Sequence, residues 1–201
     1  MTWKNRLWLT TIALVTTIAI VSAYFYTLLA AQRVVIPPEV QAIEFTSSRD
    51  APITLADFHG GYTLMAFGYT HCPDVCPLTL ADFRRIKLQL PESQQDNVRF
   101  AFISVDGARD TPAVLDEYVT RFHPDFVGIT TQDDTKLDQL AAAFDVFYER
   151  RAIEGSAVGY VCDHTAAYFL LNPEGDIVRR YPFLTVPDDI AVELSRYLLL
   201  S

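Results

Sequence analysis

Two cysteines are spaced so that their thiols could act together. Cys72 and Cys76 stand four residues apart, between an apolar run at 62–69 and a helical pattern that follows Pro77. On a helical turn this offset puts both thiols on one side, about 6 Å apart along the axis, which a disulfide tolerates. The start of a helix also favours the thiolate, the form that attacks disulfides and binds soft metals. The pair therefore predicts either thiol redox chemistry or a metal site.

Two buried and inert cysteines are the alternative interpretation, since free cysteine is among the most buried residue types. Pro73 and Pro77 lie in and just after the segment between the thiols, and proline restricts the backbone. The spacing of the two sulfurs should therefore be nearly fixed, which favours a functional pair over simple packing.

The residues around this pair predict an α/β domain. Apolar runs rich in Val, Phe, Ile and Tyr alternate with stretches of helical periodicity, which is typical of a central, mostly parallel sheet flanked by helices. Thr111 before Pro112 is a helix start, and Asn-Pro-Glu-Gly at 172–175 is a turn between two strands. The expected strands are 62–69, 98–105, 126–130, 165–171 and 176–181, and the expected helices are about 78–90, 112–122, 134–144 and 187–200.

Three short motifs carry a resemblance to a known family. They are GYTHCPDVCP at 68–77, SVDGARDTP at 104–112 and DHT at 163–165. With them the chain resembles the Sco/SenC family, copper metallochaperones that help to assemble the binuclear copper centre of cytochrome c oxidase. Gly107 stands where this family usually has proline, and Thr165 stands where it usually has serine.

The resemblance implies a thioredoxin-like domain on a single membrane anchor and one copper ion held by Cys72, Cys76 and His164. Two thiolates and one imidazole suit Cu(I), and with oxygen or water they also accommodate Cu(II). The implied partners are the copper-bearing subunit of cytochrome c oxidase and a separate periplasmic copper donor. The protein would then be a metal carrier without catalytic residues.

A thiol-disulfide oxidoreductase is the second hypothesis. In it Cys72 attacks a disulfide of the oxidase subunit or of another partner, and Cys76 resolves the mixed disulfide. Three residues separate the cysteines where thioredoxin motifs have two, and no proline lies between Ile153 and Asn172, where such folds present a cis-proline. Both observations favour the metal site, although one protein can serve both purposes. A peroxidase of related fold is disfavoured because no motif supports it.

The third cysteine, Cys162, lies two residues before His164. In an extended segment the two side chains share a face, so Cys162 is a candidate fourth ligand, a partner for another thiol, or a small buried residue. Asp163 is a candidate for orienting a ligand, although neighbouring strand residues face opposite ways.

Other polar residues near these motifs have ordinary interpretations. Asp106, Arg109 and Asp110 are expected to form the turn and cap that open the next helix. His71 adjoins Cys72 and is expected to be an exposed loop residue that can tune the neighbouring thiol.

The amino-terminal segment predicts a membrane anchor. Residues 7–32 contain no Asp, Glu, Lys or Arg, a run of 26, whereas a membrane-spanning helix needs about 20 apolar residues. A cleaved signal peptide would have a shorter apolar region. Lys4 and Arg6 favour a cytoplasmic amino terminus, so the chain is expected to be a single-pass protein of a bacterial inner membrane with a periplasmic domain. The expected parts are a cytoplasmic stub at 1–6, the anchor at 7–32, an extended linker at 33–42 and the copper-binding domain at 43–201.

Composition excludes other classes of protein. The 201 residues carry a net charge of −9, and 50% of them are hydrophobic, with a mean hydropathy of +0.15. A disordered chain is excluded by this apolar content, and a nucleic-acid binder by the lack of a basic stripe. Residues 34–201 hold 13 basic and 25 acidic side chains, a net of −12, which suits partners with basic docking surfaces.

Overall fold

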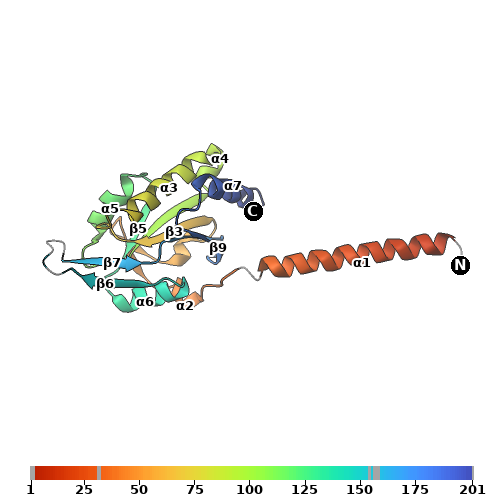
Figure 1. The fold of residues 1–201 in the computed structure, drawn as a ribbon, viewed down its shortest axis with the longest axis horizontal. Coiled ribbons are helices and arrows are strands. Elements are labelled where there is room, and N and C mark those ends of the chain that lie inside the picture. Colours follow the sequence, from red (N-terminus) through yellow and green to blue (C-terminus); the bar gives the residue numbers. More distant parts are fainter. Residues whose placement is uncertain (1–2, 31–32, 154, 156–158, 201) are drawn as a thin grey trace. The chain divides into compact units, whose positions relative to one another are not determined.

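The computed structural model describes residues 3–30, 33–153, 155 and 159–200 (Figure 1). The chain divides into two compact units, 1–34 and 35–201. The first unit contains one helix, α1 (Trp3–Ala30). The second contains the sheet, the remaining helices and all three cysteines.

The predicted membrane anchor is not supported. Of the helices in the described part of the chain, none combines the length and apolar character that a bilayer crossing needs. This finding overturns the expected anchor at 7–32, and with it the expected single-pass placement in a bacterial inner membrane. The prediction rested on missing charges, which is a weaker condition than uniform apolarity. Thr16 and Thr17 place polar hydroxyls within this continuous helix, and the hydroxyls donate to backbone carbonyls of the preceding turn at 2.8–3.0 Å.

The segment expected to be an extended linker, residues 33–42, is partly helical, and residues 35–42 belong to the second unit. Pro38–Gln41 form α2, with proline in its first turn, where its missing N–H costs nothing. Ile36 is 1% exposed, and its N–H donates to Asp176 Oδ1 at 3.1 Å. The expected extended linker is therefore helical at residues 38–41.

One seven-stranded sheet forms the centre of the second unit, in the order β2-β1-β5-β4-β3-β8-β9. β3 pairs in parallel with β4, and β4 with β5, whereas the other four pairings are antiparallel. The sheet is thus mixed, and the expected mostly parallel sheet is corrected. The tight turn at 172–175 forces β8 and β9 into an antiparallel hairpin. The two shortest strands, β1 and β2, have three and two residues, which is too short for a recognisable hydrophobic pattern. The strands are β1 (Phe45–Ser47), β2 (Pro52–Ile53), β3 (Tyr62–Gly68), β4 (Val98–Ser104), β5 (Val127–Thr130), β8 (Ala167–Leu171) and β9 (Ile177–Pro182).

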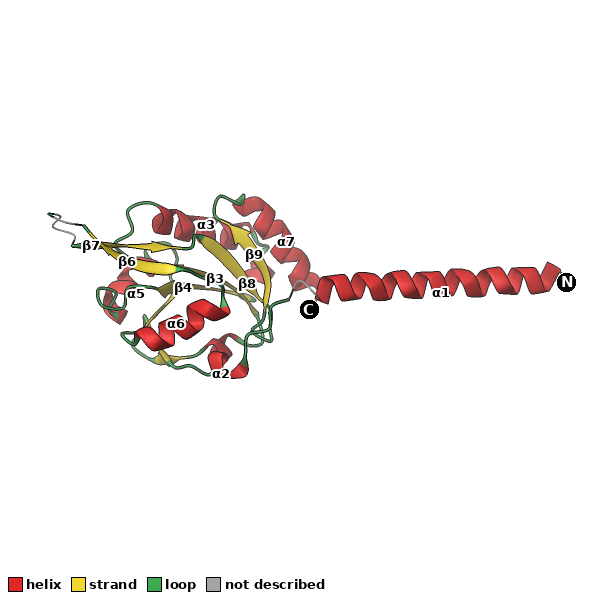
Figure 2. Cartoon of the chain, turned by 60° about the horizontal axis from the view of Figure 1, so that its bottom comes forward, coloured by secondary structure: helices red, strands yellow, loops and turns green. Residues whose placement is uncertain are grey.

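Helices cover both faces of this sheet, as Figures 1 and 2 show. One face carries α3 (Val75–Gln89), α5 (Pro112–Thr120) and α7 (Pro187–Leu200), and the other carries α6 (Asp134–Ala143) and α2. Two further short helices in the described part of this unit are η1 (Leu55–Phe58) and α4 (Glu92–Gln95). Thr111 caps α5 by accepting from the Val114 N–H, and Asp133 caps α6. The four longer helices, α3, α5, α6 and α7, confirm the predicted ones, although α3 begins at Val75, three residues before the expected start and without a side-chain cap.

Aromatic side chains fill the core on both faces of the sheet. Phe83 of α3 packs against Phe100 and Tyr168, with ring centroids 5.6 and 5.5 Å apart. Phe67 packs edge-on against Phe144, which follows α6, at 5.3 Å. All five rings are at most 2% exposed, so the strands that lead to the thiols are held rigidly.

A second, two-stranded sheet was not predicted. β6 (Tyr148–Ala152) pairs antiparallel with β7 (Tyr160–His164), and Tyr148 lies opposite His164. The sequence YERRA of β6 has no apolar alternation because the strand is largely exposed. The sequence suggested that His164 begins the apolar strand now seen as β8. In the structure His164 is instead the last residue of β7.

Candidate metal centre

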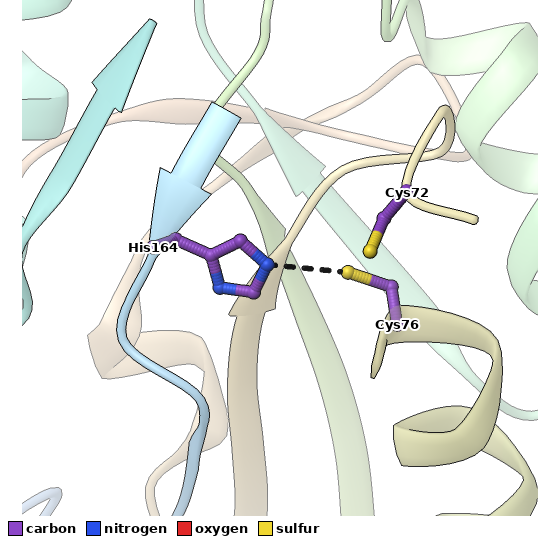
Figure 3. Close-up of side chains that lie close together, drawn as sticks. All are labelled: Cys72, Cys76 and His164. Carbon is purple, nitrogen blue, oxygen red and sulfur yellow. Dashed lines mark hydrogen bonds between the residues drawn. The ribbon is translucent and has the colours of Figure 1, made fainter. Parts of the chain in front are cut away.

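Three predicted side chains converge at the edge of the sheet where the parallel strands end. β3 ends at Gly68, and the chain turns through Cys72 into α3, whose first turn contains Cys76. β7 brings His164 to the same edge. The ligand atoms of the three side chains all lie within 4.8 Å of one another (Figure 3). Carboxyl ends of parallel strands meet at one edge, which is where sites of α/β proteins usually form.

The Cys76 side chain occupies space that is free because residue 68 is glycine. A Cβ at Gly68 would lie 2.5 Å from Cys76 Sγ and 2.6 Å from the Phe102 ring. Glycine at this position lets the buried thiol, on a residue that is 1% exposed, sit against the end of β3. Cys72 lies in the turn before α3 and is only half-buried, so this thiol is the accessible one.

The imidazole of His164 faces the thiols. Its Nε2 lies 3.4 Å from Cys76 Sγ, and its Nδ1 lies 3.2 Å from the Thr165 carbonyl oxygen. With the Nδ1–H donating to that carbonyl, the lone pair of Nε2 points toward the sulfurs, the tautomer that a metal requires. The buried Tyr69 ring packs edge-on at 5.9 Å and limits how the imidazole can turn.

The two thiols hold one proton between them. The hydrogen bond from Cys76 is the largest cause that lowers the pKa of Cys72, to about 3. The same contact, followed by burial, raises the pKa of Cys76. Cys72 is therefore a ready thiolate, and a metal that binds both sulfurs displaces the proton of Cys76.

The donor set fits a soft, thiophilic metal. Two sulfurs and one imidazole nitrogen match Cu(I), and three ligands leave one side open for a group from another molecule. Among the described residues, no second group of His, Cys, Asp and Glu gathers ligand atoms in this way.

The other sequence candidates lie outside this group. Cys162 is buried and does not join the three ligands, and burial raises the pKa of its thiol to about 11. Asp163 points away and pairs with Arg151 at 2.9 Å, so it does not orient a ligand. His71 is exposed beside Thr70 Oγ1, at 3.1 Å. The hypotheses of a fourth thiol ligand and of an orienting Asp163 therefore find no support in the geometry.

The predicted cap before α5 is only partly right. Thr111 does the capping, whereas Asp110 is fully buried and accepts hydrogen bonds from Thr70, just before Cys72. No local pattern of residues indicates this contact, because it joins residues 40 positions apart.

Comparisons with known proteins agree with the family resemblance carried by the motifs at 68–77, 104–112 and 163–165. The sequence profile of the SCO1/SenC family matches residues 37–199. The mitochondrial protein SCO1 homolog 1 of Arabidopsis thaliana is 34% identical over 149 residues, which is 72% of this chain and 44% of that protein. The chain thus spans less than half the length of this relative.

Solved structures show the same fold. The crystal structure of Arabidopsis thaliana ScoI with copper bound has a TM-score of 0.72 and 28% identity, covering 79% of this chain and 97% of that one. Bradyrhizobium japonicum ScoI with copper bound has a TM-score of 0.68 and 32% identity, covering 77% and 96%. The second unit therefore has the thioredoxin-like α/β fold of these proteins.

Proposed function

The chain belongs to the SCO1/SenC family, and we propose on this premise that it carries one copper ion, bound by Cys72, Cys76 and His164, to the copper-bearing subunit of a cytochrome c oxidase. The observation that supports the proposal most strongly is the gathering of two thiols and one imidazole within 4.8 Å. Two relatives of known structure are described as having copper bound, which supports copper as the metal. The second unit, residues 35–201, would form the copper-binding domain.

The exposure of the ligands suits a carrier. Cys76 is buried, whereas Cys72 and His164 are partly exposed, so an acceptor can reach the ion without unfolding the sheet. An acceptor thiolate can enter on the open side and displace the ligands one after another. The copper is the cargo of this reaction, and a separate copper donor would load it.

A Cu(I) titration of the reduced full-length protein tests this proposal. We expect one tightly held ion and two sulfur neighbours in X-ray absorption spectra. His164→Ala should weaken retention against a chelator by at least tenfold. His59→Ala is the matched control, because His59 bonds Gln41 Oε1 at 2.6 Å beside the 172–175 turn, away from the thiols. Copper that is bound below one equivalent and equally well by His164→Ala would contradict the proposal.

Thiol-disulfide exchange is a second candidate function, favoured by the low pKa of the accessible Cys72 next to the buried thiol of Cys76. Cys72 would attack a partner disulfide, and Cys76 would then displace the partner thiol, leaving a Cys72–Cys76 disulfide and two partner thiols. Rapid reduction of a model disulfide by the copper-free protein, abolished in Cys72→Ser, would favour this function. A rate no faster than that of free cysteine would exclude it.

A further inference from the structure

The loop between β4 and α5, residues 105–111, contacts both halves of the metal centre. It leaves the sheet at Ser104, which pairs with Gly68 at the end of β3. Its side chains extend in two directions, one toward the segment that carries the cysteines and one toward the strand that carries the histidine. The sequence predicted Asp106, Arg109 and Asp110 as the turn and cap that open the next helix.

The cysteine side is held by Asp110, which is 0% exposed. Its Oδ2 accepts from the Thr70 N–H at 3.0 Å and from the Ser104 hydroxyl at 2.6 Å, and its Oδ1 accepts from the Thr70 hydroxyl at 2.6 Å. Thr70 stands two residues before Cys72. One carboxylate therefore fixes both the backbone and the side chain at the point where the thiol loop leaves β3.

The histidine side is held by Arg109 and Asp106. The guanidinium of Arg109 lies 3.7 Å from the Tyr160 ring centroid and donates to the Tyr160 carbonyl oxygen at 3.1 Å. Asp106 accepts from Arg109 Nε at 2.5 Å and from the Tyr160 hydroxyl at 2.6 Å. Tyr160 begins β7, the strand that ends at His164, so these contacts fix the start of that strand.

The loop is itself fixed against the sheet. A Cβ on Gly107 would lie 1.8 Å from the Thr131 carbonyl oxygen, so only glycine permits this close approach to the end of β5. The Thr130 hydroxyl donates to the Asp110 carbonyl at 2.9 Å, and the Asp106 N–H donates to the Ser104 hydroxyl at 3.0 Å. Because the loop is held at both ends and in its middle, it can keep the cysteine segment at a fixed distance from the strand that carries His164.

We propose that the β4–α5 loop sets the separation between the thiol pair and His164, with Asp110 positioning the cysteine side and Arg109 with Asp106 positioning the histidine side. These are positioning residues, since they act through Thr70 and Tyr160 and none belongs to the three-ligand group. The functional importance of this positioning rests on the proposed copper site. Its two sides can nevertheless be tested apart from each other and without copper.

The cysteine side is tested by the redox equilibrium of the copper-free, full-length protein with glutathione. Glutathione disulfide oxidises the two thiols to the Cys72–Cys76 disulfide and is itself reduced to two glutathione molecules. In Asp110→Ala we expect the equilibrium constant for disulfide formation to fall at least tenfold, about 30 mV toward a more positive potential. The reason is that the thiols lose their fixed spacing.

Three further variants keep this test decisive. Thr70→Val removes one hydroxyl bond without opening a cavity and should shift the equilibrium in the same direction if Asp110→Ala does not fold. Thr70→Ser keeps the hydroxyl and should restore the original equilibrium. Asp176→Ala is the matched control, because Asp176 is 3% exposed, also accepts a backbone N–H, and lies at the far end of the sheet.

The histidine side is tested with Arg109→Lys, which keeps the charge and loses the stacking and the forked donors. We expect changed ring ¹⁵N shifts of His164 in the copper-free protein and at least tenfold weaker Cu(II) binding with altered spectra. The disulfide equilibrium should stay within twofold. Arg180→Lys is the control, since Arg180 also bonds a carboxylate, Asp145, and lies 5.5 Å from the Phe169 ring centroid.

The outcomes separate the two proposals. Equal shifts of the disulfide equilibrium in Asp110→Ala and Asp176→Ala would overturn the positioning role of the loop, as would equal His164 shifts in Arg109→Lys and Arg180→Lys. An unmodified protein that does not retain copper would instead overturn the proposed function. In that case the disulfide equilibrium and the His164 shifts still decide whether the loop positions the site.

Discussion

The thiol half and the histidine half of the metal centre are supported in different ways. Cys72 and Cys76 follow β3, whose residues 63–68 are buried in the middle of the seven-stranded sheet. His164 ends a two-stranded sheet whose other strand, β6, is largely exposed. The core therefore fixes the thiols, whereas a few polar and aromatic contacts fix the imidazole. Damage to the core should disturb both halves, and damage to the small sheet should disturb only the second.

The largest effect is expected from Gly68→Val. Its Cβ would clash with Cys76 Sγ and with the Phe102 ring, at 2.5 and 2.6 Å. We expect copper affinity to fall by at least a hundredfold and stability by about 1–3 kcal/mol, the usual cost of overpacking a core. Chelator competition and urea unfolding measure the two effects. Gly61→Ala, whose Cβ lies 3.3 Å from the Asn97 carbonyl oxygen, should change copper affinity little.

A smaller effect, measured on the thiols of the copper-free protein, is expected from Cys76→Ala. In the unmodified protein the pKa of Cys72 is lowered to about 3, so its alkylation rate should be nearly constant from pH 5 to pH 8. Without the hydrogen bond from Cys76 the pKa of Cys72 should rise, and the rate at pH 5 should fall at least tenfold relative to that at pH 9. Mass spectrometry distinguishes Cys72 from Cys162, whose pKa of about 11 keeps it a thiol. An unchanged pH profile would mean that Cys76 does not stabilise the thiolate.

A modest effect, confined to the histidine half, is expected from Arg150→Ala. Arg150 of β6 donates two hydrogen bonds to the Asp134 carboxylate of α6, at 2.9 and 3.0 Å. Its loss should cost less than about 1 kcal/mol of stability, since the pair is partly exposed. We expect copper retention to weaken a few-fold while the disulfide equilibrium stays constant. A shift of that equilibrium would show that the two halves are not supported independently.

The smallest effect is expected from Arg151→Ala. Arg151 pairs with exposed Asp163 on the outer face of the small sheet, where water and salt screen the attraction. Copper retention and the urea midpoint should both stay within error of the unmodified protein. A clear loss of copper would instead show that the outer face of β7 helps to orient His164.

Local signals explain which elements could be predicted. Thr111 with Pro112 and Asp133 mark helix starts that the structure contains, and continuous apolar runs mark β3 and β4. The exposed strand β6 has no such signal, so the hairpin that carries His164 was missed. The missing charges of 7–32 were also a local signal, and they did not establish a membrane span.

The sequence by itself determined the thiol pair, its place at the start of a helix, and the family motifs, because all of these depend on neighbours within a few residues. Only the tertiary structure decided that His164 reaches Cys76 and that Cys162 stays apart. It also decided that Asp110 holds Thr70. These contacts join residues 40 to 88 positions apart. Strand register and packing fix such distances, and no local pattern of residue types encodes them.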